Sequence, residues 1–162
     1  MKKKYAALIF CAIGLLLGSV TSEAKKKPSV TAESAIVMDV QSGAILYEKN
    51  IDKREYPASI TKVMTALVAI ENSSLSETVT YSRNAVTNLE SGASNIEIQP
   101  GEKLSMEDSL YAILLMSANE ACNGVAEHVA GSIDNFVAMM NQKAKELGCT
   151  GTNFANANGL WM

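Results

Sequence analysis

Apolar and polar positions along the chain separate a leader, a linker and a folded region. Three lysines at positions 2–4 precede an apolar run from Tyr5 to Val20, and the small residues of Ser22–Ala24 follow it. A basic start, an apolar stretch and small residues are the order found in secretory signal peptides. The run is shorter than the about 20 residues of a membrane span, and an uncleaved anchor is the alternative. We predict a signal peptide over residues 1–24, hence a secreted, extracytoplasmic chain, and a polar linker over residues 25–33.

The first part of the folded region has the pattern of a β-hairpin followed by a helix. The short apolar runs Ser34–Asp39 and Ala44–Tyr47 flank the turn-forming segment Gln41–Gly43, which predicts two paired strands. From residue 59 to residue 70 apolar side chains recur at helical spacing. The apolar positions of that predicted helix are Ile60, Val63, Met64, Leu67 and Val68. Residues 72–104 are rich in Ser, Asn, Thr and Gly, and we expect them to be irregular.

Three further helices are predicted after the irregular segment, over residues 105–116, 120–130 and 132–147. Ser105–Asp108 resembles a capping box at the start of the first helix. Ser117–Asn119 interrupts the helical pattern, and Gly131 ends the second helix. The pattern as a whole predicts an α+β fold in one folded region, residues 34–162, that ends in a loop rich in Gly and Asn.

Composition excludes several classes of protein. Apolar residues make up 48% of the 162 residues and Cys totals 3, which excludes disordered, collagen-like and disulfide-scaffold proteins. A net charge of −3 provides no basic excess for nucleic acid. One His and scattered Cys argue against a metal site, and we expect no cofactor. A disulfide between Cys122 and Cys149 is left open, because Cys122 is equally suited to a helical core.

Lys62 is the residue that most strongly indicates chemistry. It is the only charged residue between Pro57 and Ile70, and its neighbours three and four positions away are Ser, Thr or Ala, so no acid on its own helix can pair with it. Burial of such a lysine lowers its pKa toward that of a general base. Ser59 lies one turn earlier, at the predicted helix start, where the helix field favours an ionised hydroxyl. A serine nucleophile with a lysine base is an arrangement used for acyl transfer.

The same spacing also has a structural interpretation. Ser-x-x-Lys recurs at Ser22–Lys25, and Ser-x-Asn occurs at Ser82–Asn84 as well as at Ser117–Asn119. Only the segment at 117–119 interrupts two apolar helices, where buried polar side chains need partners and are expected to face a cleft. In the structural interpretation, Ser59 is an N-cap and Asn119 caps a loop. Spacing alone does not decide between the two.

From about Ser34 to Leu160 the sequence resembles the serine D-alanyl-D-alanine carboxypeptidases, the low-molecular-mass penicillin-binding proteins. Pro57–Thr65 (PASITKVMT) resembles their nucleophile segment, and Leu115–Ala121 (LMSANEA) resembles their second motif. The predicted hairpin resembles their opening strands, and Asn158–Leu160 resembles a loop that follows the second motif. The order of these segments is that of the family. The resemblance implies a β-lactamase/transpeptidase-like α+β fold.

The resemblance also implies a role for each matching residue. Ser59 is expected to attack the carbonyl of the penultimate D-Ala of a peptidoglycan pentapeptide stem and to form an acyl-enzyme. Lys62 accepts the proton, and Ser117 relays a proton toward the leaving D-Ala. Asn119 binds the substrate amide and orients Lys62, while the backbone N–H of Ser59 supplies half of the oxyanion hole. β-Lactams are the implied acylating inhibitors, and no metal or cofactor is implied.

The family's third motif, Lys-Thr-Gly, does not occur in these residues. In the family it lies on a strand that lines the cleft, so the implied fold is incomplete: the hairpin and the helical part are present, and later strands and a C-terminal helix are missing. Removing one oxyanion donor lowers a rate by about 10²–10³. We therefore expect an N-terminal fragment with little or no activity alone, associated with a membrane only if a missing C-terminal part carries an anchor.

Two other functions share these motifs. A serine β-lactamase-like hydrolase needs an efficient base for deacylation, and no acid has a spacing that assigns it this role. A non-catalytic, secreted peptidoglycan-binding module needs no working nucleophile. His128, the only His, lies in a helix rich in Ala and Val and is expected to be structural.

Overall fold

The computed structural model describes residues 28–87 and 89–160. The predicted signal peptide and the first three residues of the predicted linker, 25–27, lie outside these residues. The chain divides into two compact units between Lys53 and Arg54, and each unit is described by itself. In the described part of the chain, no helix has both the length and the apolar character needed to cross a membrane.

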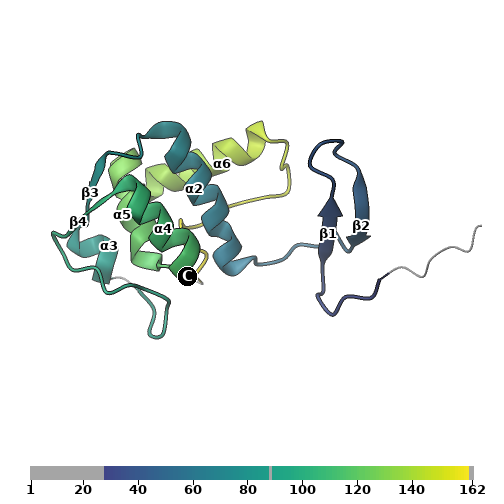
Figure 1. The fold of residues 1–162 in the computed structure, drawn as a ribbon, viewed down its shortest axis with the longest axis horizontal. Coiled ribbons are helices and arrows are strands. Elements are labelled where there is room, and N and C mark those ends of the chain that lie inside the picture. Colours follow the sequence, from purple (N-terminus) through teal and green to yellow (C-terminus); the bar gives the residue numbers. More distant parts are fainter. Residues whose placement is uncertain (1–27, 88, 161–162) are drawn as a thin grey trace, which may run out of the picture. The chain divides into compact units, whose positions relative to one another are not determined.

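The first unit contains the predicted hairpin (Figure 1). Strand β1 (Ala35–Met38) pairs antiparallel with β2 (Ile45–Lys49), and the register shifts between Val37 and Met38. Asp39 closes the turn, because its carboxylate accepts a hydrogen bond from the Ser42 N–H at 2.8 Å. Gly43, with φ of 71°, supplies the left-handed residue that such a tight turn requires. The hairpin expectation is thus confirmed.

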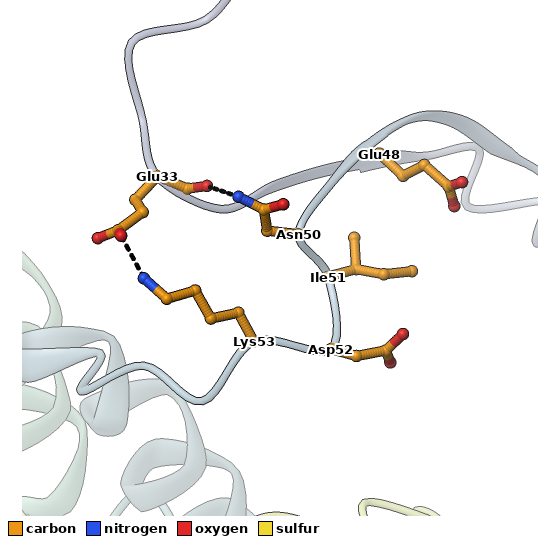
Figure 2. A pocket seen from close by; sticks show the side chains of 6 residues that line it. All are labelled: Glu33, Glu48, Asn50, Ile51, Asp52 and Lys53. Atoms are coloured by element: carbon orange, nitrogen blue, oxygen red, sulfur yellow. Dashed lines mark hydrogen bonds and ion pairs between the residues drawn. The ribbon is translucent and has the colours of Figure 1, made fainter.

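A pocket of about 640 Å³ lies beside the end of this hairpin (Figure 2). Its lining residues are Glu33, Glu48, Asn50, Ile51, Asp52 and Lys53. The Asn50 side chain donates to the Glu33 carbonyl at 2.8 Å, and Lys53 pairs with the Glu33 carboxylate. The pocket contains none of the four predicted site residues, which all lie in the second unit.

The second unit consists of helices with one small sheet (Figure 1). Its elements in chain order are η1 (Ala58–Ile60), α2 (Thr61–Asn72), β3 (Thr78–Thr80), α3 (Arg83–Thr87), β4 (Lys103–Ser105), α4 (Met106–Met116), α5 (Asn119–Ala130) and α6 (Ile133–Glu146). Helix α5 packs against α2, α3, α4, α6 and β3. It therefore runs through the core and is the element on which the surrounding helices converge.

The core of this unit is apolar and filled by side chains from every helix around α5. Its largest fully buried apolar side chains are those of Tyr81, Phe136, Met106, Ile113 and Met140. Burial of each such side chain contributes about 1.5–3 kcal/mol. Helix α5, whose first turn carries Asn119, is thus held in place by the packed core around it.

Both predicted serine caps are present. Ser105 begins α4 and accepts a hydrogen bond from the Asp108 N–H at 3.0 Å, while Ser132 begins α6 and accepts from the Asn135 N–H at 3.1 Å. Each cap satisfies a backbone donor that the helix itself leaves open. The predicted irregular segment is more ordered than expected, because β3 pairs antiparallel with β4 across it and α3 lies between them.

Helix α2 buries a stripe that differs from its predicted apolar positions. Ile60, just before the helix, and Val63 are 70% and 63% exposed, whereas Lys62 and Thr65 are buried. Hydrogen bonds explain the orientation, because Thr65 Oγ1 donates to the Ala157 carbonyl at 2.6 Å. The helix thus turns a polar face toward the loop of residues 156–160, and that face carries the lysine.

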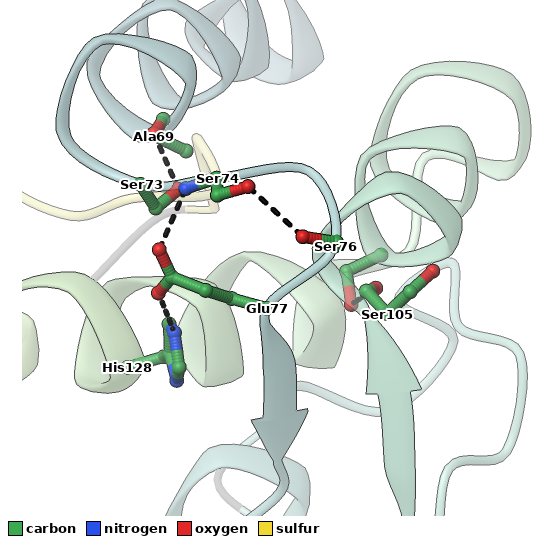
Figure 3. Close-up of polar contacts among 8 residues, drawn as sticks. Ala69, Ser73, Ser74, Ser76, Glu77, Ser105 and His128 are labelled. Atoms are coloured by element: carbon green, nitrogen blue, oxygen red, sulfur yellow. Dashed lines mark hydrogen bonds and ion pairs between the residues drawn. The ribbon is translucent and has the colours of Figure 1, made fainter.

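A polar cluster joins the end of α2 to α5 (Figure 3). Ser73 Oγ donates to the Ala69 carbonyl at 2.6 Å. The Glu77 carboxylate accepts from the Ser74 N–H at 2.7 Å and contacts His128 Nε2 at 2.9 Å. The Ser74 N–H and then His128 hold the pKa of the Glu77 carboxyl below its usual value. His128 thus has a structural partner, as expected from the sequence.

Candidate active site

Ser59 lies on η1, a single 3₁₀ turn immediately before α2, and its side chain is exposed to solvent. Ala58 before it has φ of 47°, a left-handed conformation that is uncommon for a residue with a Cβ. Gly159 packs against this turn so closely that a Cβ at position 159 would lie 2.0 Å from the Ala58 carbonyl oxygen. Neither η1 nor α2 has a side-chain cap. The interpretation of Ser59 as an N-cap is therefore wrong.

Lys62 is the second residue of α2, three residues after Ser59, and is only 3% exposed. Its Nζ is 3.3 Å from Ser59 Oγ, 2.8 Å from Asn119 Oδ1 and 2.7 Å from the Asn158 carbonyl oxygen. The described residues place no carboxylate within ion-pair distance of this amine. Burial lowers the pKa of Lys62 from its usual value near 10.5, because desolvation disfavours the ammonium form.

Ser117 and Asn119 come from the break between α4 and α5. Ser117 ends α4 with φ of 57°, and this left-handed residue turns the chain so that its Oγ donates to Ser59 Oγ at 2.8 Å. Asn119 begins α5 and is 3% exposed. Its Nδ2 donates to the Ser94 carbonyl at 2.8 Å, while its Oδ1 accepts from Lys62. Its side chain therefore binds residues from two distant segments, the lysine of α2 and the loop that contains Ser94.

The contacts of Lys62 define what the amine can do chemically. Asn119 Oδ1 and the Asn158 carbonyl can only accept hydrogen bonds. A neutral lysine satisfies both with its two N–H groups and directs its remaining lone pair at Ser59 Oγ. A neutral Lys62 can thus act as a base toward the Ser59 hydroxyl. All four residues predicted from the sequence meet at this point.

Two contributors to the site were not predicted. The Asn158 carbonyl holds Lys62, and the Ser94 carbonyl holds Asn119. Both act through the backbone, which every residue type carries, so the side-chain pattern contains no signal for them. The segment Asn158–Leu160 was noted only through family resemblance.

The second Ser-x-Asn motif serves the fold. Ser82 Oγ accepts from the Ala85 N–H at 3.0 Å at the start of α3, and Asn84 Nδ2 donates to Glu127 at 2.9 Å. Ser22–Lys25 lies outside the described residues. Cys122 and Cys149 are both free thiols, and burial raises the pKa of the Cys122 thiol to about 12. Among the described residues no group of His, Cys, Asp and Glu is arranged to hold a metal ion.

Comparison with known proteins assigns the family. The family model for D-alanyl-D-alanine carboxypeptidases, peptidase family S11, matches residues 21–162. The chain belongs to the D-alanyl-D-alanine carboxypeptidase family. The match covers both serines, the lysine and the asparagine of the site.

Curated relatives of this carboxypeptidase-family chain share about a third of its residues. The D-alanyl-D-alanine carboxypeptidase DacF of Bacillus subtilis is 35% identical over 169 residues, which covers 98% of this chain and 43% of the relative. DacC of Escherichia coli is 37% identical over 141 residues, which covers 82% of this chain and 35% of the relative. The chain thus spans less than half the length of these relatives.

Solved structures of the family share the fold. The D-alanyl-D-alanine carboxypeptidase DacD from Francisella tularensis superposes with a TM-score of 0.78 at 34% identity, covering 85% of this chain and 34% of that one. Penicillin-binding protein 5 from Haemophilus influenzae gives a TM-score of 0.77 at 33% identity, covering 83% of this chain and 41% of that one. The predicted α+β, β-lactamase/transpeptidase-like fold is confirmed.

Proposed function

We propose that this chain carries the nucleophile half of a serine-type D-Ala-D-Ala carboxypeptidase site, with Ser59 as nucleophile and Lys62 as general base. The observation that carries the proposal is the environment of Lys62. Its amine is buried, has no acidic partner among the described residues, and is held by two carbonyl oxygens within reach of Ser59 Oγ. A buried lysine without a counter-charge is costly unless its neutral form is used.

The proposed reaction begins with attack of Ser59 Oγ on the carbonyl carbon of the penultimate D-Ala of a peptidoglycan stem. Lys62 takes the Ser59 proton as the new C–O bond forms. Ser117, hydrogen-bonded to Ser59, gives its proton to the nitrogen of the terminal D-Ala as the peptide C–N bond breaks. Ser117 regains a proton from the Lys62 ammonium, which returns Lys62 to its neutral form. Water then releases the acyl group from Ser59, and Lys62 acts as base again.

The same site chemistry gives the partners and the location. β-Lactams present a strained amide carbonyl to the same nucleophile and would leave an acyl group on Ser59. Peptidoglycan lies outside the cytoplasmic membrane, which agrees with the export predicted for residues 1–24.

The domain organisation that we propose is a signal peptide, a linker over residues 25–33 and a partial catalytic domain over residues 34–162. Without a Lys-Thr-Gly strand in these residues, we propose that they have little or no carboxypeptidase activity on their own, with slow acylation of Ser59.

The experiment is mass spectrometry of the purified 162-residue chain after incubation with a penicillin. We expect one adduct, confined to the peptide that contains Ser59 and absent from Ser59→Ala. We expect it to form about 10²–10³ times more slowly than the adduct of DacC from Escherichia coli assayed alongside, as for a site lacking one oxyanion donor. The matched control is Ser82→Ala, which removes the serine of the second Ser-x-Asn motif and should leave the adduct unchanged.

Other outcomes would contradict the proposal. An adduct that persists in Ser59→Ala, or no adduct after prolonged incubation, means that Ser59 is not an activated nucleophile. Rapid hydrolysis of the adduct would favour the β-lactamase-like alternative, although in the described residues no carboxylate hydrogen-bonds to Ser59 or Lys62. Muropeptide binding that is unaffected by Ser59→Ala, without any adduct, would favour the non-catalytic binding module.

A further inference from the structure

Glu120 is a buried carboxylate directly next to the site that the reaction does not use. It follows Asn119 in the first turn of α5 and is 1% exposed. Its Oε1 accepts a hydrogen bond from the Ile96 N–H at 2.6 Å. Its Oε2 is buried and has no hydrogen-bond partner among the described residues. A side chain of this kind is retained in a core only where the bond that it makes matters.

The loop that Glu120 binds also fixes the amide of Asn119. The Ser94 carbonyl accepts from both the backbone N–H of Asn119, at 3.0 Å, and its side-chain Nδ2, at 2.8 Å. Because a carbonyl can only accept, the amide must present its NH₂ group to Ser94 and its oxygen to the opposite side. That oxygen is Oδ1, the acceptor 2.8 Å from Lys62 Nζ. The Ser94 carbonyl thus decides which end of Asn119 faces the lysine.

Few other contacts hold this loop in place. In the described part of the chain, the Asn95 side chain bonds only within the loop, to the Ala93 carbonyl and the Glu97 N–H. Among the described residues, the hydrogen bonds that tie residues 94–96 to the helices go to Asn119 and Glu120. Ser94 and Ile96 are themselves exposed, so packing adds little to their anchoring.

We propose that Glu120 is a positioning residue, which holds the 94–96 loop so that the Ser94 carbonyl keeps Asn119 Oδ1 on Lys62. The proposal rests on the proposed function, because it gives Asn119 the task of orienting the base. Glu120 touches neither Ser59 nor Lys62 in the described contacts, and it acts through the backbone of Ile96. The Ile96 N–H donates to Glu120 Oε1 at 2.6 Å, and this single hydrogen bond anchors an exposed loop.

The unpartnered Oε2 determines which substitutions should preserve the anchor. Glu120→Gln keeps an oxygen at the Oε1 position and removes a buried charged oxygen that has no partner. Glu120→Asp keeps the charge but shortens the side chain by one methylene, so its oxygen no longer reaches Ile96. Glu120→Ala removes the acceptor altogether. The proposal therefore predicts that Glu120→Gln behaves like the unchanged chain, and that Glu120→Asp behaves like Glu120→Ala.

The experiment is NMR spectroscopy of the 162-residue chain and these variants, without substrate. Two signals are measured: hydrogen exchange of the Ile96 amide, and the position of the Asn119 side-chain NH₂ resonances. In Glu120→Ala and Glu120→Asp we expect Ile96 exchange to rise at least about tenfold, as for loss of one hydrogen bond, and the Asn119 resonances to move to the positions of a solvated amide. Glu120→Gln should retain both signals. Glu97→Gln, the same change on the exposed side of this loop, is the matched control.

Three results would overturn the proposal. They are unchanged Asn119 resonances in Glu120→Ala, a Glu120→Gln variant that behaves like Glu120→Ala, and an Ile96 amide in the unchanged chain that exchanges as fast as that of Asn95. The last needs no variant, so it decides even if Glu120→Ala fails to fold. A merely structural role would loosen the loop without moving the Asn119 resonances. Because no substrate is involved, failure of the penicillin experiment with these NMR results intact would reject the proposed function alone.

Discussion

At the scale of single residues, the site depends on a lysine that is buried with no counter-charge among the described residues. The hydrogen-bond partners of Lys62 Nζ are neutral oxygens of Ser59, Asn119 and Asn158. Neutral acceptors compensate only part of the hydration that an ammonium loses on burial. The lowered pKa of Lys62 is thus a property of the fold that can be measured through stability, even where the chain turns over no substrate.

Replacing Lys62 by Met should change how stability depends on pH. Between the lowered pKa of Lys62 in the fold and its usual 10.5, the unfolded chain binds a proton that the folded chain does not. The free energy of unfolding therefore rises with pH across this window through Lys62, and Lys62→Met lacks that rise. The measurement is urea unfolding at a series of pH values. We expect the difference between the unchanged chain and Lys62→Met to grow toward pH 10.5.

Lys143 supplies a control of opposite sign for that experiment. Hydrogen bonds from its ammonium to Glu71 and then Glu146 raise the pKa of Lys143 above 10.5. Its contribution is full below pH 10.5 and is lost as pH rises through the raised pKa. The difference between the unchanged chain and Lys143→Met should therefore shrink in alkali. Equal, flat differences for both variants would contradict the assignment of a depressed pKa to Lys62.

At the scale of elements, the loop of residues 156–160 supports η1, the turn that carries Ser59. Asn156 Oδ1 accepts from the Gly159 N–H at 2.6 Å, and the Asn158 carbonyl reaches Lys62 at 2.7 Å. Gly159 has φ of 84° and no room for a Cβ beside Ala58. The loop thus needs glycine at this position for two independent reasons.

Gly159→Ala and Gly148→Ala separate those two reasons. Gly148, at the end of α6, has φ of 80° but nothing within 4 Å of an added Cβ. Gly148→Ala should therefore lower the free energy of unfolding only by the cost of a left-handed alanine, about 1–2 kcal/mol. Gly159→Ala should lower the free energy of unfolding by that amount and by about 1–3 kcal/mol more, because the backbone must shift away from Ala58. Urea unfolding of both variants measures the two losses. Equal losses would mean that the contact with Ala58 is relieved at no cost.

Sequence patterns predicted the elements of this unit better than the contacts between them. The helices over 59–70, 105–116, 120–130 and 132–147 all occur, because their periodicity is a local signal, and serine caps add a second local signal for α4 and α6. Strands β3 and β4 were missed, since each is three residues long and is stabilised by a partner far along the chain. The stripe that α2 buries was also missed, because Thr65 and Lys62 are held by the Ala157 and Asn158 carbonyls rather than by apolar contacts.

The same distinction applies to the site. Ser59, Lys62, Ser117 and Asn119 could be named because their side chains form recognisable motifs and the family keeps those motifs in order. Glu120 could not be named, although it lies beside Asn119 in the sequence, because its partner is a backbone N–H 24 residues away.

At the scale of the whole molecule, the described chain consists of two units that divide between Lys53 and Arg54. In its described residues, 28–53, the hairpin unit has two strands, and a two-stranded hairpin by itself is marginally stable in water. The helical unit has a core shared by all of its helices. The two units are therefore expected to differ in resistance to unfolding.

Limited proteolysis tests this difference. Residues 50–60 are exposed throughout, and trypsin cleaves after Lys53 and Arg54. With dilute trypsin we expect the first long-lived product to begin at Arg54 or Glu55 and to retain the helical unit. Mass spectrometry of the products over time gives the boundaries. A first stable product that has been cut within α2, α4 or α5 would contradict the view that the helical unit is the more stable part.

The carbonyl oxygens around Lys62 also restrict how this site can change during evolution. Exchange of lysine for arginine is among the mildest replacements on a protein surface. At position 62 an arginine would keep the positive charge, yet its guanidinium stays protonated at any physiological pH and carries no lone pair for a serine proton. Under the proposed role of Lys62 as the base, a replacement that similarity scores count as conservative would therefore abolish the reaction.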